Sequence, residues 1–213
     1  MNKHIILLIN GKRRSGKGLL SNKIVEKTSK KYSNNVHILS FAEPIKQITQ
    51  PILEEIKWDG QNKEVVRPLW IAMGEVGRNI DNNLWCSKVF DKIENIIIDS
   101  ANKDQDSLFI IDDLRFPNEL DYFKSRQKIL ADKVKKIHNG DVKVTSVRIE
   151  KFLDPEKFIK GVDDNSTETS FDKLVNICFD YIVPADILID REWYPNFQNV
   201  DVIAQTVIKN LLK

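Results

Sequence analysis

The chain has 213 residues, of which 41% are hydrophobic and 30% charged, and its formal net charge is +2. This composition is enough for a packed core, which excludes a disordered chain, and the balanced charge argues against a dedicated nucleic-acid binder. The two cysteines, Cys86 and Cys178, lack the CxxC spacing of a metal or redox site. No apolar run reaches the roughly 20 residues of a membrane span. The sequence predicts one soluble, cytoplasmic domain over residues 1–213, with neither membrane nor nucleic acid as a partner.

Short β-branched apolar runs alternate with longer helical patterns, which is typical of a parallel α/β sheet. Most of these runs are apolar on both faces, so helices are expected to cover each side of the sheet. In chain order the sequence predicts strand 5–9, helix 16–31, strand 36–41, helices 44–56, 64–79 and 84–101, strand 108–112, a helix that opens at Pro117, strand 142–149, strand 181–183 with 187–189, and helix 199–212.

Two polar stretches interrupt this pattern. Residues 124–141 are rich in lysine and predict a solvated helix and turn that lead into the fourth strand. Residues 151–168 are polar and contain Gly161 and an Asp-Asp-Asn-Ser cluster at 163–166. We expect a mobile loop or lid near residues 150–170, of the kind that phosphoryl-transfer enzymes use to exclude water.

The strongest local signal follows the first strand and opens the first helix. Residues 11–18 read Gly-Lys-Arg-Arg-Ser-Gly-Lys-Gly and meet the pattern G-x-x-x-x-G-K. In such a loop the backbone N–H groups wrap a phosphate at the positive end of a helix, and Lys17 reaches the β- and γ-phosphates. Gly18 stands where a hydroxyl usually contacts magnesium. A glycine turn in a basic loop, or a nuclear-localisation-like run at 12–14, is the alternative, but the strand before and the helix after favour the phosphate loop.

Charged residues gather after the third predicted strand. The run ends in Asp112 and Asp113, and a carboxylate in this position beside a phosphate loop is where magnesium is held. Arg115 follows at the crevice where α/β proteins bind ligands, and its planar donors match phosphate oxygens. A surface ion pair between Arg115 and Glu119, four residues on, is the alternative.

The predicted helix 64–79 contains Gly74 and Gly77 one turn apart, and each glycine costs a helix about 1 kcal/mol against Ala. Close approach of a substrate to the backbone would justify both glycines, with Arg67 and Arg78 beside them. A helix end with solvated arginines is the alternative.

Together these segments resemble the phage-type deoxynucleoside monophosphate kinase family, whose loop is shared by the animal-type phosphomevalonate kinases. The matching runs are Gly-x-x-Arg-Ser-Gly-Lys at 11–17, Phe-Ala-x-Pro-Ile-Lys at 41–46, Gly-Glu-Val-Gly-Arg at 74–78 with Asp81 and Trp85, Asp-Leu-Arg-Phe-Pro-Asn-Glu at 113–119, and a weaker Ser-x-Glu at 166–168 before Phe-Asp-Tyr-Ile at 179–182. They touch most of the chain in the family's order. The family usually has Asp where Gly18 stands and Asn where Pro184 stands.

The resemblance implies a P-loop, nucleoside monophosphate kinase-like α/β fold, with a parallel sheet of about five strands, helices on both faces and a lid. It implies that the enzyme, with Mg²⁺ as cofactor, transfers the γ-phosphoryl group of ATP to a deoxynucleoside monophosphate, in the host cytoplasm if the chain is viral. A phosphomevalonate kinase-like enzyme and a catalytically impaired nucleotide-binding protein are the alternatives. The accepted bases stay open, as does the oligomeric state, for which a homodimer is one option.

The resemblance also implies roles for individual residues. Catalysis would use Lys17, Arg14, Asp113 and Arg115. ATP would be bound by Gly11, Arg13, Arg14, Ser15, Gly16, Lys17 and Gly18. The acceptor would be bound by Lys46, Arg67, Gly74, Glu75, Arg78, Trp85, Arg115 and Glu168. Arg148 and Lys151 would approach from the lid, and Asp113 and Asp112 would hold magnesium.

Overall fold

The computed structural model describes residues 2–33, 35–99, 105–150, 156, 158–174, 179–184 and 199–213. Within them, one sheet has the order β2-β3-β1-β4-β5, and every neighbouring pair is parallel. The strands are β1 (Asn2–Gly11), β2 (Val36–Leu39), β3 (Ser107–Leu114), β4 (Gly140–Ile149) and β5 (Tyr181–Val183). The predicted five-stranded parallel sheet is confirmed. The run 187–189, expected to extend the last strand, lies outside the described residues.

β1 lies at the centre of the sheet, between β3 and β4, and is buried from His4 to Gly11. Successive side chains of a strand point to opposite faces. Ile6 and Leu8 therefore enter one core layer and Ile5, Leu7 and Ile9 the other. Burial on both faces explains why the sequence of this strand is a continuous apolar run without alternation.

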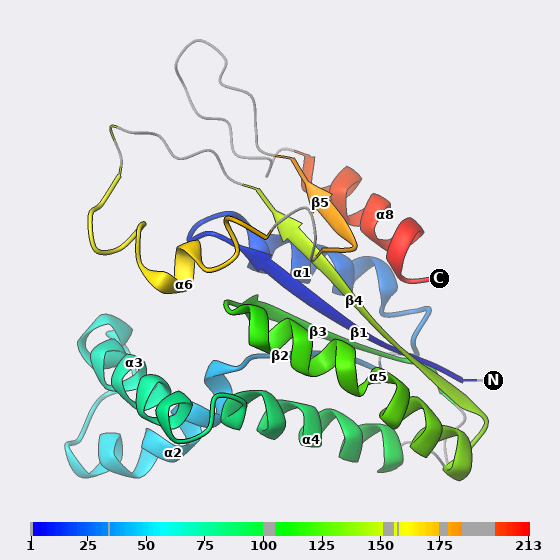
Figure 1. Cartoon of the computed structure of the whole chain (residues 1–213), viewed down its shortest axis with the longest axis horizontal. Coiled ribbons are helices and arrows are strands. Elements are labelled where there is room, and N and C mark those ends of the chain that lie inside the picture. Colours follow the sequence, from blue (N-terminus) through cyan, green and yellow to red (C-terminus); the bar gives the residue numbers. More distant parts are fainter. Residues whose placement is uncertain are drawn as a thin grey trace.

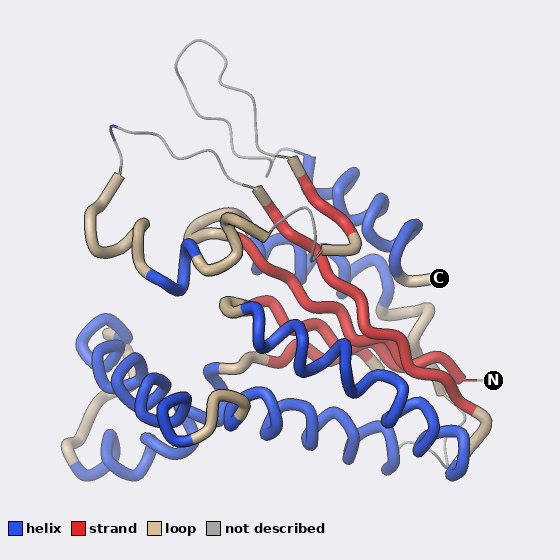
Figure 2. Tube along the Cα trace, in the orientation of Figure 1, coloured by secondary structure: helices blue, strands red, loops and turns tan. Residues whose placement is uncertain are grey.

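Helices cover both faces of the sheet (Figures 1 and 2). α1 (Lys17–Thr28) and α8 (Val200–Leu211) cover the face of Ile5, and α4 (Leu84–Asp99) and α5 (Pro117–Ile137) cover the face of Ile6. α2 (Ala42–Glu55) and α3 (Lys63–Ile80) pack against each other and against α4. Figure 1 places α3 and the single-turn helix α6 (Ser166–Thr169) on either side of the carboxyl ends of the strands. Those ends are where ligands bind in parallel α/β sheets.

The polar stretches 124–141 and 151–168 differ in how they compare with their predicted structures. Residues 124–137 do not form a separate solvated helix, because they are the second half of α5, which buries Leu130, Ala131 and Val134 against the sheet while its lysines face outward. The predicted turn into the fourth strand is present at 138–139. In the described part of 151–168, the chain forms turns at 160–164 and the start of α6. None of the described helices combines the length and the apolar character of a membrane span.

A buried polar cluster lies at the opposite end of the sheet, near the amino ends of the strands. His4 Nδ1 lies 2.7 Å from Ser107 Oγ, and His4 Nε2 lies 3.0 Å from His138 Nε2. Burial, together with the charge of His138, lowers the pKa of His4 to about 4, while Asp106 acts in the opposite direction. This cluster joins β1 to β3 and to the turn before β4, and it is far from the site described next.

Candidate active site

The loop between β1 and α1 curls back on itself at the carboxyl edge of the sheet. Arg14 (φ +58°) and Gly16 (φ +87°) both have left-handed backbone conformations, and Gly16 caps the amino end of α1. The Ser15 N–H donates to the Lys12 carbonyl at 3.1 Å. Successive turns of this kind direct backbone N–H groups into one concavity at the positive end of the helix. The strand, loop and helix predicted around residues 11–18 are therefore present.

Lys17 lies folded against this loop. Its Nζ donates to the carbonyls of Gly11 (2.6 Å) and Lys12 (2.9 Å). Burial lowers the pKa of Lys17 to about 8, and the positive charge of Arg115 adds to the shift. An anion that binds beside this ammonium group would stabilise its charged form and raise its pKa again.

Ser15 gives the concavity a further polar group. Its Oγ is buried and has no hydrogen-bond partner among the described residues. Gly11 permits this arrangement, because a Cβ at that position would lie 2.4 Å from the hydroxyl. A buried hydroxyl without a partner is costly and is satisfied when a phosphate oxygen binds beside it.

The two aspartates at the end of β3 face opposite ways, as successive strand residues do. Asp113 accepts three hydrogen bonds at the start of α2, from Ser40 Oγ (2.6 Å) and from the N–H groups of Phe41 (2.9 Å) and Ala42 (3.1 Å). Burial raises the pKa of Asp113, and these donors oppose that shift. Asp112 instead faces α1, where Ser21 Oγ donates to it at 2.9 Å. The geometry therefore favours Asp112 over Asp113 as a magnesium ligand.

Magnesium bound with a nucleotide takes one or two carboxylates, water and phosphate oxygens. Asp112 supplies such a carboxylate. It lies near Lys17, where its negative charge opposes the lowering of the pKa of that residue. Ser21 was missed by sequence reasoning, although its position one helical turn after Lys17 places both on one face of α1. Gly18 contributes no side chain, and a Cβ there would meet nothing within 4 Å, so a hydroxyl residue would fit.

A cavity of about 510 Å³ opens beside the loop, between α2, α3 and α6. Seven of the eight predicted acceptor residues line it: Lys46, Arg67, Gly74, Arg78, Trp85, Arg115 and Glu168. Glu75 does not line it and is exposed on α3.

Two aromatic side chains of the cavity wall, Trp70 and Phe116, were missed by sequence reasoning. Lys46 Nζ lies 5.4 Å from the centre of the Trp70 ring, and the Arg78 guanidinium lies 4.9 Å from that of Phe116. The available signal was that Trp70 precedes Gly74 by one helical turn, on the same face of α3.

Gly77 is explained by Trp85 and not, as expected, by close approach of a substrate, whereas Gly74 lines the cavity and a Cβ there would lie 3.1 Å from Cδ1 of Ile45. A Cβ at Gly77 would lie 2.2 Å from Cζ2 of the Trp85 ring. Trp85 Nε1 donates to the Gly74 carbonyl at 2.9 Å, and the side chain is 4% exposed. The ring therefore joins α3 to α4, and it forms a wall of the cavity as part of the protein's core.

Arg115 is not paired with Glu119, which excludes the surface ion pair that the sequence left open. Glu119 Oε2 accepts the N–H groups of Arg115 (2.7 Å) and Phe116 (3.0 Å), and burial raises the pKa of Glu119 to about 8. The Arg115 guanidinium instead contacts Glu168 Oε1 at 2.6 Å. Glu119 thus fixes the backbone that carries Arg115, and Glu168 fixes its side chain.

Among the described site residues, Arg148 lies elsewhere than expected. Arg148 is part of β4 and only 2% exposed, so it does not approach from a lid. It contacts Asn10, immediately before Gly11, and so supports the base of the loop. Arg67 forms a 3.0 Å ion pair with Glu64 at the rim of the cavity. Lys151, also expected in the lid, lies outside the described residues.

A parallel sheet in this strand order, with a phosphate-binding loop between its central strand and α1 and a carboxylate at the end of the adjacent strand, defines a P-loop kinase fold. Residues 9–129 match the model of the phosphomevalonate kinase family, which is more than half of the chain. The chain belongs to this family and is a phosphotransferase of the P-loop kinase type.

Two solved structures are similar over nearly all of the chain. Thymidylate kinase from Ehrlichia chaffeensis is 17% identical, with 97% of this chain and 99% of that one covered and a TM-score of 0.45. Shikimate kinase from Acinetobacter baumannii is 13% identical, with 98% and 95% covered and a TM-score of 0.33. Neither likeness says which molecule this chain phosphorylates. No curated protein sequence matches it.

Proposed function

We propose that this protein is an ATP-dependent deoxynucleoside monophosphate kinase, which transfers the γ-phosphoryl group of ATP to a deoxynucleoside monophosphate and releases the diphosphate and ADP. The proposal rests on the cavity beside the loop, which combines cationic and aromatic walls. A nucleoside monophosphate has a dianionic phosphate and a flat aromatic base, and this cavity offers partners for both.

Phosphate recognition would fall to the arginines. Arg78 and Arg115 line the cavity on the side of Phe116, and Arg67 lies at its rim. Guanidinium groups donate in a planar fork that matches phosphate oxygens, which a lysine does not. The aromatic faces of Trp70 and Phe116 would contact the base. The volume of about 510 Å³ falls within the range of small-molecule sites.

Little covalent chemistry is required of the protein in phosphoryl transfer, because positioning and charge stabilisation carry the catalysis. The loop N–H groups and Ser15 Oγ would bind the phosphates of ATP, and Lys17 with Arg14 would neutralise charge on the transferred group. Asp112 would hold magnesium, which when bound neutralises phosphate charge. Arg115 lies between loop and cavity, where it would contact the phosphates of both substrates.

Phosphomevalonate is the second candidate acceptor, and the family match favours it. It also carries a phosphate that arginines would bind. It has no aromatic ring, however, and so gives no role to the faces of Trp70 and Phe116.

The two candidates are separated by an ADP-release assay over deoxynucleoside monophosphates, ribonucleoside monophosphates and mevalonate phosphate. We expect turnover with at least one deoxynucleoside monophosphate. Turnover with mevalonate phosphate alone would establish the second candidate. ATP binding without turnover on any acceptor would show a nucleotide-binding protein that has lost catalysis.

A further inference from the structure

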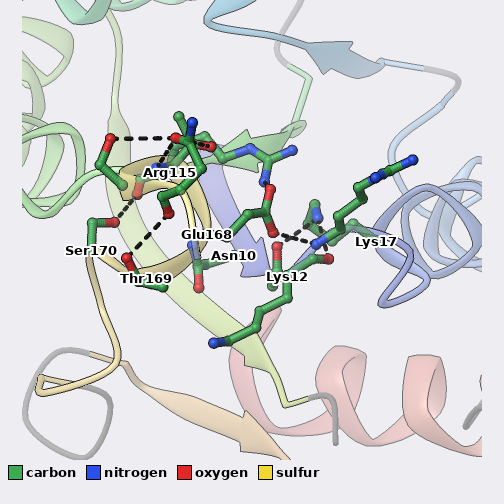
Figure 3. Close-up of polar contacts among 12 residues, drawn as sticks. Asn10, Lys12, Lys17, Arg115, Glu168, Thr169 and Ser170 are labelled. Atoms are coloured by element: carbon green, nitrogen blue, oxygen red, sulfur yellow. Dashed lines mark hydrogen bonds and ion pairs between the residues drawn. The ribbon is translucent and has the colours of Figure 1, made fainter. Parts of the chain in front are cut away.

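The segment 165–172, which contains α6, lies against the phosphate loop although about 150 residues separate them in the chain (Figure 3). Glu168 is the central contact. Its Oε2 accepts the backbone N–H of Arg13, and its Oε1 lies 2.6 Å from Arg115 Nη1. The Glu168 side chain is 8% exposed, so both of its oxygens are used inside the site.

Three further contacts hold the segment in place. Asp172 pairs with Lys12 Nζ at 2.7 Å and with Arg148 Nη2 at 3.2 Å. Ser170 Oγ donates to the carbonyl of Arg115. Glu168 and Asp172 thus bind one backbone N–H group of the loop and three cationic side chains around the loop.

The groups that Glu168 occupies are those that a phosphate would use. A carboxylate and a phosphate both offer several anionic oxygens to N–H donors and guanidinium forks. They cannot share one pair of donors, because two anions at hydrogen-bond distance from the same groups would repel each other. The Lys17 ammonium is also engaged within the protein, by the carbonyls of Gly11 and Lys12.

We infer that Glu168 is an internal substitute for phosphate, which occupies the loop while nucleotide is absent and must be displaced when the phosphates of ATP bind. The inference rests on the proposed function only in that the loop binds ATP, and it holds for either acceptor. Asn165, Thr167 and Glu168 also line the acceptor cavity. Displacement therefore releases Arg115 and moves one wall of the cavity, so ATP binding prepares the acceptor site.

The first test is calorimetric binding of ATP and of inorganic tripolyphosphate, each with magnesium and without acceptor. Glu168→Gln keeps the shape of the side chain and removes the competing charge, so we expect both ligands to bind about tenfold more tightly than to the parent. Glu94→Gln is the matched control, because Glu94 pairs with Lys133 between α4 and α5. That variant should bind as the parent does.

Equal or weaker binding by Glu168→Gln would overturn the inference and leave the proposed function intact. Failure of the parent and of Glu168→Gln to bind either ligand would overturn both. A second readout needs no variant: ATP should accelerate hydrogen exchange of the amides of Thr169 and Ser170, which now bond to the carbonyls of Asn165 and Ser166. Slower or unchanged exchange at saturating ATP would contradict displacement.

Discussion

Replacing Gly77 with alanine tests whether Trp85 packing, and not a substrate, requires a glycine near the carboxyl end of α3. The added Cβ would lie 2.2 Å from Cζ2 and 2.5 Å from Cε2 of a ring that is 4% exposed, so the ring must move. Overpacking of a core costs about 1–3 kcal/mol, and loss of the hydrogen bond from Trp85 to Gly74 costs about 1 kcal/mol. Alanine recovers about 1 kcal/mol of helix propensity. We therefore expect a net loss of about 2 kcal/mol in the free energy of unfolding.

The assay is urea unfolding followed by tryptophan fluorescence, with Gly18→Ala as the matched control. The chemical change is the same, but a Cβ at Gly18 meets nothing within 4 Å, so that variant should be as stable as the parent or up to about 1 kcal/mol more stable. A Gly77→Ala variant as stable as the parent, or an equal loss of unfolding free energy in both variants, would contradict this role of Trp85.

Three other predictions address charges. Lys17→Ala should lower kcat by about 10²–10³-fold, as loss of an electrostatic donor does, with little change in melting temperature; the parental rate would contradict its role. Asp112→Asn should raise the magnesium concentration for half-maximal turnover by about tenfold, whereas Asp113→Asn should chiefly lower the melting temperature, and the opposite pattern in a magnesium titration would reverse the assignment. The pKa of His4 is about 4 in the folded protein against 6.5 for the free side chain, so the unfolded state binds the proton first as the pH falls. Between pH 6.5 and 4 the parent should lose about 3 kcal/mol more stability than His4→Asn, and parallel curves in urea titrations would contradict this.

The fold could be predicted from the sequence because its determinants are local. The apolar run of β1, the glycines of the loop and the amphipathic pattern of α4 each specify an element without reference to distant residues. The misplaced boundary, at the lysine-rich half of α5, arose because only Leu130, Ala131 and Val134 carry its buried face. Three apolar residues among many lysines are a weak periodic signal.

The phosphate loop could be predicted from the sequence, but the side-chain contacts around it could not. Asp112 and Asp113 are adjacent and chemically identical, and only the positions of α1 and α2 determine which one faces the loop. The contact between Glu168 and Arg13 joins residues 155 positions apart, which no local pattern records. From the sequence alone, Gly77 is interpreted as a substrate contact. The Trp85 ring that packs against Gly77 belongs to the next helix, so the pattern of α3 alone does not reveal it.

Phosphorus NMR of the products shows directly whether the phosphoryl group of ATP passes to a phosphate held in the cavity. The protein is incubated with ATP, magnesium and each deoxynucleoside monophosphate in turn, and the spectrum is followed over time. We expect the resonances of ADP and of a deoxynucleoside diphosphate to grow at equal rates while those of ATP and the monophosphate decline. Release of inorganic phosphate with no diphosphate from any deoxynucleotide, or no change in the spectrum, would contradict it.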